Sequence, residues 1–329
     1  MWQEIVLAAF APVVTSRAQA HMLKYIIKKL PHLVIVVLGV SIITFFIMHL
    51  SGDPAQLMLS KEATAQEIDA YSHALGYDQP LYIQYAKFLK GAVQGDFGMS
   101  MVHRRSAFQI VIERLPATLE LAFSAIIFAI LVAVPMGIIA AVKRNSLFDY
   151  SSMGVALGLQ SMPTFWFAIM LVLVFSVTFN IFPTSGRGSF SQLVLPTVAL
   201  GSFYMAMISR LTRSGLLEVL SEDYIRTARA KGVKEYLVVF KHALKNSLIP
   251  LVTVVGLEFG RLLGGAVITE TVFEWPGVGK LAVTAINQRD YPVVQAVVFV
   301  LAVTFVLVNF FTDLLYSYLD PRIRFDAED

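Results

Sequence analysis

The sequence predicts an all-α integral membrane protein with six transmembrane helices and a small helical insert outside the membrane. Of the 329 residues, 57% are hydrophobic and 15% are charged, whereas soluble domains carry about 25% charged residues. The cations, which leave a net charge of +3, cluster between apolar stretches, as cations that orient membrane helices do. This clustering excludes a soluble nucleic-acid-binding protein.

Six stretches are apolar enough to span a membrane, which takes about 20 residues for about 30 Å of hydrocarbon. They cover residues 30–50, 117–142, 150–179, 193–211, 247–269 and 292–316. Pro135, Pro163 and Pro196 fall inside or at the edge of these stretches. We expect them to be tolerated there, because neighbouring helices can satisfy the carbonyls that a proline leaves free.

The distribution of Lys and Arg predicts that both termini are cytoplasmic, since cations near span ends favour the inner side. The two short outer loops would carry three cations: Arg187, Lys280 and Arg289. The inner segments would carry fifteen: Lys24, Lys28, Lys29, Lys143, Arg144, Arg210, Arg213, Arg226, Arg229, Lys231, Lys234, Lys241, Lys245, Arg322 and Arg324.

The spans divide the chain into a first helix (22–51), an outer insert (52–115), a five-helix domain (116–318) and a cytoplasmic tail (319–329). In the insert, Thr64 and Glu67 form a capping-box pattern for one helix, and a second helix is expected over 81–93.

We interpret residues 1–21 as a non-essential extension or a mis-assigned start before Met22. A signal peptide cleaved after Ala20 is the alternative, but the extension has no cation at its start, and cleavage would place Lys24 outside.

A basic, amphipathic segment over 221–246 separates the fourth and fifth spans. Ser221 is a candidate N-cap for its first helix. Gly232 allows a backbone turn that residues with a Cβ resist, and a second helix is expected over 234–246. The simplest alternative is a basic helix that lies on anionic lipid.

Several motifs resemble the permeases of the dipeptide, oligopeptide, glutathione and nickel class of ATP-binding-cassette importers. The resemblance rests on Gly52-Asp-Pro-Ala55, Leu75-Gly-Tyr-Asp-Gln-Pro-Leu81, Gln94-Gly-Asp-Phe-Gly98, Arg226-Thr-Ala-Arg-Ala-Lys-Gly232, His242-Ala-Leu-Lys-Asn246, Thr271-Val-Phe-Glu-Trp-Pro-Gly-Val-Gly279 and Arg289-Asp-Tyr-Pro-Val293. Two positions depart from the family's coupling region, where Arg226-Thr-Ala228 replaces Glu-Ala-Ala and Lys245 stands at a frequent proline.

The resemblance implies a type I importer permease in a bacterial inner membrane. Its partners would be membrane lipid, a second homologous permease, two ATPase subunits and a periplasmic or lipid-anchored substrate-binding protein. The residues implied to couple to the ATPase are Tyr224, Thr227, Ala228, Ala230 and Gly232. No cofactor is expected on this chain, and ATP and Mg would be bound by the ATPases. Dipeptide, oligopeptide, glutathione and a nickel complex remain open as substrates.

The fifth span contains a stripe of small residues and one pair of charges. Gly256, Gly260 and Gly264 form two overlapping GxxxG repeats, which let another helix approach closely. Glu258 and Arg261 point away from this stripe, and charges inside a membrane face a partner or water. They are candidates for the translocation path, with a purely structural salt bridge as the alternative.

Other charged residues support no catalytic or metal site. Glu120, Asp313 and His49 lie near span ends, where snorkelling or packing explains them. There is no cysteine, no metal-ligand motif, and no GxxxxGK[ST] loop that would cradle ATP phosphates. A secondary transporter or channel is the alternative function, but it leaves 221–246 unexplained, and a membrane enzyme lacks a catalytic constellation.

Overall fold

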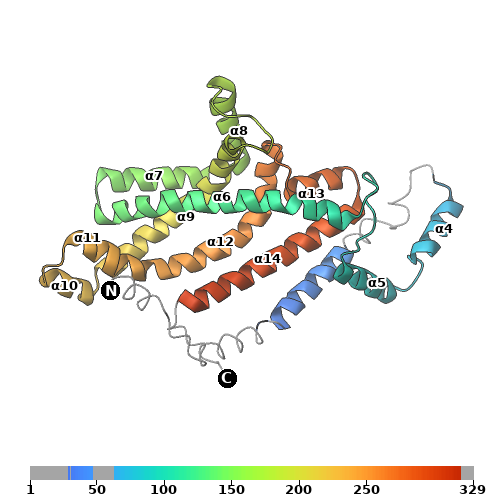
Figure 1. The fold of residues 1–329 in the computed structure, drawn as a ribbon, viewed down its shortest axis with the longest axis horizontal. Coiled ribbons are helices and arrows are strands. Elements are labelled where there is room, and N and C mark those ends of the chain that lie inside the picture. Colours follow the sequence, from blue (N-terminus) through green and yellow to red (C-terminus); the bar gives the residue numbers. More distant parts are fainter. Residues whose placement is uncertain (1–28, 30, 47–62, 320–329) are drawn as a thin grey trace, which may run out of the picture.

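The computed structural model describes residue 29, residues 31–46 and residues 63–319, and within these ranges it contains helices and no strand. Three helices are long and apolar enough to cross a membrane: α6 (Ala107–Val142), α9 (Phe190–Leu220) and α14 (Tyr291–Leu319). Figure 1 shows them, with α12 (Leu244–Val272), running along the length of the molecule. The first predicted span is a helix over Pro31–Phe46 in its described part. The total of six spans stays a prediction.

The insert predicted over 52–115 forms, in its described part, the helices that the sequence predicts. In α4 (Ala65–Leu75), Thr64 and Glu67 form a complete capping box, and Gly76 ends the helix in the left-handed conformation with a φ of 76°. The second helix, α5 (Leu81–Gln94), lies against the first span, because the Tyr85 and Ser41 hydroxyls are 2.7 Å apart. Figure 1 shows α4 and α5 at the opposite end of the molecule from α10 (Asp223–Ala230) and α11 (Glu235–Leu237).

The third predicted span is not one continuous helix. It divides into α7 (Leu147–Ser161), α8 (Thr164–Leu171) and a π-helical turn, η1 (Val172–Thr178), with a bend of 106° between the first piece and the other two. The bend lies at Met162, which is extended with a ψ of 135°. The cause is Pro163, because a residue before proline disfavours the α conformation. Whether the two pieces form one broken span with this proline inside it stays a prediction.

The centre of the molecule is the contact between α6 and α9, which pack through small residues. A Cβ on Gly201 would lie 2.7 Å from the Ala125 carbonyl oxygen, and one on Gly137 would lie 2.7 Å from that of Ser209. Ala122, Ala125, Ala129 and Ala133 of α6 are fully buried here. The two backbones therefore approach as closely as small residues permit.

Buried polar side chains tie the insert to the last two helices, α13 (Val278–Asn287) and α14. Asp290, which is 1% exposed, accepts hydrogen bonds from the Ser100 hydroxyl and, at 3.2 Å, from the Met101 backbone N–H. Phe97 packs beside them against Phe299, with ring centroids 5.3 Å apart. At the other end of α14, Lys29 forms an ion pair with Asp313 and so joins the start of the first helix to α14.

Candidate functional site

The segment over 221–246 folds as two short helices joined by a left-handed turn. Gly232 has a φ of 74°, and its N–H bonds to the Arg229 carbonyl while the Val233 N–H bonds to the Ala228 carbonyl. This arrangement caps α10, as glycine does at many helix ends. The chain then continues through α11 and a π-helical turn, η2 (Val238–Ala243), directly into α12. The second predicted helix is confirmed, with this π-helical turn inside it.

The predicted N-cap at Ser221 was wrong by one position. The residue before α10 is Glu222, and Ser221 instead ends α9, where its hydroxyl donates to the Glu218 carbonyl at 2.6 Å. A serine hydroxyl can bond backward to the preceding turn as readily as forward to a new helix. Local sequence alone does not decide between these two uses.

The inner face of this segment is apolar and packs on the ends of α6 and α9. Ile225 and Val238 are fully buried, in one cluster with Leu216 of α9 and Ile138 of α6. Burying side chains of this size contributes about 1.5–3 kcal/mol each. The segment is therefore seated on the two central helices.

The outer face carries most of the residues implied to couple to an ATPase. Tyr224, Thr227, Ala230 and Gly232 are exposed, whereas Ala228 is half-buried against the apolar cluster. Two further aromatic side chains, Tyr236 and Phe240, are 58% and 59% exposed. Sequence reasoning did not single them out, although an amphipathic helix with aromatics on its outer face is a signal for a partner.

Two polar contacts hold the halves of the segment together. Arg229 forms an ion pair with Glu235 across the turn, with Nη2 2.7 Å from the carboxylate. The hydrogen bond from Arg229 lowers the pKa of Glu235. The Tyr224 hydroxyl accepts a hydrogen bond of 2.9 Å from the Asn246 side chain. The segment thus holds its shape through contacts that remain exposed to solvent.

Glu258 and Arg261 form an ion pair of 2.9 Å on α12, and the two groups differ greatly in burial. The Glu258 side chain is 7% exposed and that of Arg261 is 71% exposed. Arg261 belongs to an exposed face of α12 that also contains Leu257, Gly264 and Ile268. The structure therefore brings the two candidate path residues together, with one charge inside the fold and one outside it.

The structure brings two of the three glycines in the stripe to one helix. A Cβ on Gly256 would lie 1.8 Å from Thr312 of α14, and one on Gly260 would lie 3.1 Å from Phe305 of the same helix. Gly264 has no atom of the described residues within 4 Å of such a Cβ. Gly256 and Gly260 thus lie at the contact between α12 and α14, and Gly264 lies on the exposed face of α12.

A buried carboxylate that sequence reasoning missed organises the loop between α12 and α13. Glu270 is fully buried and accepts hydrogen bonds from the Thr118 hydroxyl at 2.7 Å and the Lys280 backbone N–H at 2.9 Å. A Cβ on Gly277 would lie 2.1 Å from its carboxylate. Beside it, the buried Trp275 indole donates to the Ala117 carbonyl at 2.8 Å. The glycines of the loop leave room for the carboxylate.

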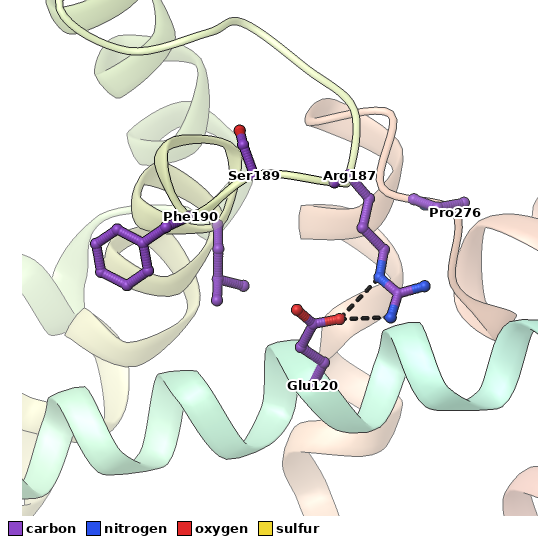
Figure 2. Close-up of a pocket in the computed structure, with 7 residues that line it drawn as sticks. Glu120, Arg187, Ser189, Phe190 and Pro276 are labelled. Atoms are coloured by element: carbon purple, nitrogen blue, oxygen red, sulfur yellow. Dashed lines mark hydrogen bonds and ion pairs between the residues drawn. The ribbon is translucent and has the colours of Figure 1, made fainter.

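A polar pocket of about 570 Å³ opens next to this loop, and we call it the mouth pocket. Its lining comes from α6, the start of α9 and the loop between α12 and α13: Glu120, Arg187, Gly188, Ser189, Phe190, Leu193 and Pro276. Figure 2 shows the Arg187 and Glu120 side chains pointing toward each other across it. Nε and Nη2 of Arg187 lie 2.7 and 2.6 Å from Oε2 of Glu120.

The described residues contain no catalytic constellation, and no group of three or more His, Asp or Glu among them could hold a metal ion. His49 and the extension over 1–21 lie outside the described residues. Apolar helices that carry both exposed and buried charges indicate a chain that spans a membrane and contacts other proteins.

Comparisons with known proteins identify relatives over nearly the whole chain. The family of binding-protein-dependent transport system inner membrane components matches residues 133–325, and its N-terminal membrane component matches residues 22–122. A dipeptide transport system permease protein of Alkalihalophilus pseudofirmus is 44% identical over 333 residues, covering 92% of this chain and 100% of that protein. A glutathione transport system permease protein of Escherichia coli K12 is 45% identical over 305 residues, with the same coverage.

Among solved structures, a chain of the MetNI methionine ABC transporter in an inward-facing conformation is similar in fold. The TM-score is 0.57, the sequence identity is 19%, and the match covers 64% of this chain and 97% of that one. This likeness confirms the type I ABC importer permease fold.

Proposed function

This chain belongs to the family of binding-protein-dependent transport system inner membrane components, and we propose that it is the permease subunit of an ATP-driven importer of small peptides. The observation that carries the proposal is the segment over 221–246, with its apolar face seated on α6 and α9 and its aromatic face exposed. The peptide substrate is supported by relatives at 44% and 45% identity, whose names specify dipeptide and glutathione transport.

As a membrane permease subunit, the chain is not itself an enzyme, and the energy for transport comes from separate subunits. Its sequence has no GxxxxGK[ST] loop. We assign ATP and Mg binding to two ATPase partners that contact Tyr224, Thr227, Ala228, Ala230 and Gly232. Closure of the ATPase pair would move α10, and the helical segment that runs from α11 into α12, with a bend of 46° before Pro250, would carry that movement into the membrane.

We assign the exposed face of α12 to a second, homologous permease, because an exposed charge within a span requires a partner or water. Arg261 lies on that face and holds the buried Glu258. The two would line the path at the boundary between the permeases, and alternating access would open this path to each side in turn. A periplasmic or lipid-anchored binding protein would deliver the peptide at the opposite end from α10.

Uptake by the reconstituted complex tests the proposal. The chain, its partner permease, the ATPases and the binding protein are placed in liposomes, and uptake of a labelled dipeptide is measured. We expect uptake only with ATP, Mg and the binding protein together. Uptake that persists without ATP but follows an ion gradient would support a secondary transporter instead.

The proposed orientation in the bacterial inner membrane, with both termini cytoplasmic, predicts where introduced cysteines can be labelled. Lys87 lies in α5 and Lys234 next to α11, at opposite ends of the molecule. An impermeant maleimide added to intact cells with permeabilised outer membranes should label Lys87→Cys and spare Lys234→Cys. The absence of native cysteine removes background labelling. Labelling of position 234 in sealed cells would reverse the orientation.

A further inference from the structure

The ion pair in the mouth pocket is open to solvent on both sides. The Arg187 and Glu120 side chains are 36% and 40% exposed, respectively, and ion pairs this exposed contribute little to stability. Both bonds from Arg187 end on Oε2 of Glu120, and Oε1 accepts no hydrogen bond from the described residues. A ligand that offers a replacement for each charge can therefore open the pair at small cost.

Arg187 has a second favourable contact that does not depend on Glu120. Its guanidinium lies 5.9 Å from the centroid of the Trp275 ring, within the range of a cation–π interaction. Trp275 is held in place by burial and by its bond to the Ala117 carbonyl. Arg187 therefore keeps a stabilising neighbour while Glu120 turns to another cation.

Once the pair between Arg187 and Glu120 opens, each charge can bind a ligand group of the opposite sign. A guanidinium can bind a carboxylate through two parallel hydrogen bonds. The N-terminus of α9, a helix of 31 residues, also lines the pocket through its N-cap Ser189 and through Phe190, and a helix N-terminus favours negative charge. Glu120 offers a carboxylate to an ammonium group. Leu193 and Pro276 add apolar surface to the lining.

A molecule that matches this lining carries an ammonium group and a carboxylate at its two ends. In an extended dipeptide the two ends are about 6 Å apart by covalent dimensions. The volume of about 570 Å³ lies within the usual range for small-ligand sites, about 300–1,000 Å³. We propose that the mouth pocket binds a short unblocked peptide by its termini, with Arg187 on the carboxylate and Glu120 on the ammonium group. This inference rests on the proposed function and adds a binding site to it.

Protection of an introduced cysteine tests the site in the assembled complex. Phe190 lines the pocket and is 83% exposed, so Phe190→Cys gives a reactive thiol in a chain without native cysteine. The rate of alkylation by an impermeant maleimide is measured with increasing glycylglycine. Acetyl-glycylglycine and glycylglycine amide, each lacking one charge, are the matched probes.

We expect glycylglycine to slow alkylation and each blocked peptide to give the same protection only at an about tenfold higher concentration, because each lacks one charged contact. Glu120→Gln and Arg187→Gln should each raise the half-protecting concentration about tenfold, because each removes one charged hydrogen bond. A cysteine at Tyr82, which is 73% exposed in the insert, should be alkylated at the same rate throughout. The unfolding temperature of each variant is measured to show that the fold is intact.

Three results would overturn the inference. They are equal protection by blocked and free peptides, unchanged protection in both charge variants, and a thiol at position 190 that the assembled complex leaves unreactive. Protection by the empty binding protein alone would mean a docking surface in place of a peptide site. ATP-driven uptake measured on the same complex separates the two proposals, because intact uptake without protection rejects only the mouth pocket.

Discussion

The two ends of the molecule are held together by different kinds of contact. At the insert end, Glu270 and Asp290 are at most 1% exposed, and each receives hydrogen bonds from parts of the chain more than 100 residues away. At the other end, the ion pair between Arg229 and Glu235 is exposed and spans six residues. Only the apolar inner face of that segment is buried.

This difference indicates which end is built to stay rigid. Buried donors left without acceptors cost about 1–3 kcal/mol each, so the loop between α12 and α13 has one favourable arrangement. Exposed ion pairs contribute about 0–1 kcal/mol, so α10 can shift on its apolar seat at low cost. A rigid insert end and an adjustable segment over 221–246 suit the proposed subunit, which would be driven through that segment.

The largest effect is expected from filling the space beside Glu270. Gly277→Ala would place a Cβ 2.1 Å from its carboxylate, and overpacking of this kind costs about 1–3 kcal/mol. We expect a clear drop in the unfolding temperature of the purified subunit. Gly154→Ala on α7 is the matched control, because a Cβ there meets no described atom within 4 Å. Equal unfolding temperatures for the two variants would show that the insert end is not packed rigidly around Glu270.

The ion pair on α12 joins a buried carboxylate, Glu258, to an exposed guanidinium, Arg261. Removing one charge should therefore have a different effect from removing the other. Arg261→Gln leaves Glu258 buried without its cation and should impair assembly of the complex. Glu258→Gln leaves only an arginine that is already exposed to solvent. The Glu258→Gln variant should therefore assemble better than the Arg261→Gln variant. Because Arg261 is 71% exposed, solvent screens the pair, so we expect the loss from Arg261→Gln to be smaller than that for Gly277→Ala. Yield of the intact complex measures this effect.

The variant with both changes, Glu258→Gln and Arg261→Gln, separates a structural pair from a path. We expect it to assemble and keep basal ATPase activity yet lose uptake or change its substrate preference. Uptake at the parent rate and selectivity would leave the pair as structural.

A smaller effect on stability, but a clear one on coupling, is expected at Gly232. Gly232→Val places a β-branched residue at a φ of 74°, and even an unbranched side chain costs about 1–2 kcal/mol there. We expect assembly but little stimulation of ATP hydrolysis by substrate. Gly232→Asn is the control, since asparagine adopts this conformation more readily and a Cβ meets no described atom within 4 Å. If both variants are stimulated like the parent, the turn does not carry the coupling.

The smallest effect concerns the pH dependence of the inner segment. Because the pKa of Glu235 is lowered by Arg229, the pair stabilises the fold above the ordinary glutamate pKa of about 4.3. That contribution is lost as the pH falls through the lower, folded-state pKa. Proteolysis within 221–246 should therefore accelerate in acid in the parent, with a shallower change in Glu235→Gln. Identical pH profiles would show that the pair contributes nothing.

Much of the fold could be predicted because its signals are local. Hydropathy identifies the helices, and the Thr64 and Glu67 capping box lies within one turn. The bend at Pro163 has a local cause too, but its size depends on how α8 packs against α9 and the end of α12. Ser221 shows the limit of local reasoning, because its hydroxyl has two competing uses.

The contacts at the insert end could not be predicted from one sequence. Thr118 and Glu270 are 152 positions apart, and Ser100 and Asp290 are 190 apart. No periodicity or spacing links such residues before the chain is folded. The mouth pocket depends on the same kind of contact, since Glu120 and Arg187 come from separate elements. Each charge was visible in the sequence, but their pairing was not.

The close packing of α6 on α9 has a mechanical consequence. The helices that seat the segment over 221–246, through Ile138 and Leu216, are the same two that border the mouth pocket, through Glu120 and Phe190. At about 1.5 Å per residue, these sites lie about 27 Å apart along α6 and about 39 Å apart along α9. Because glycine and alanine leave few side chains between them to rearrange, the pair should tilt as a single rod. A movement of α10 would then displace the residues that line the mouth pocket, because α6 and α9 would deform little between the two sites.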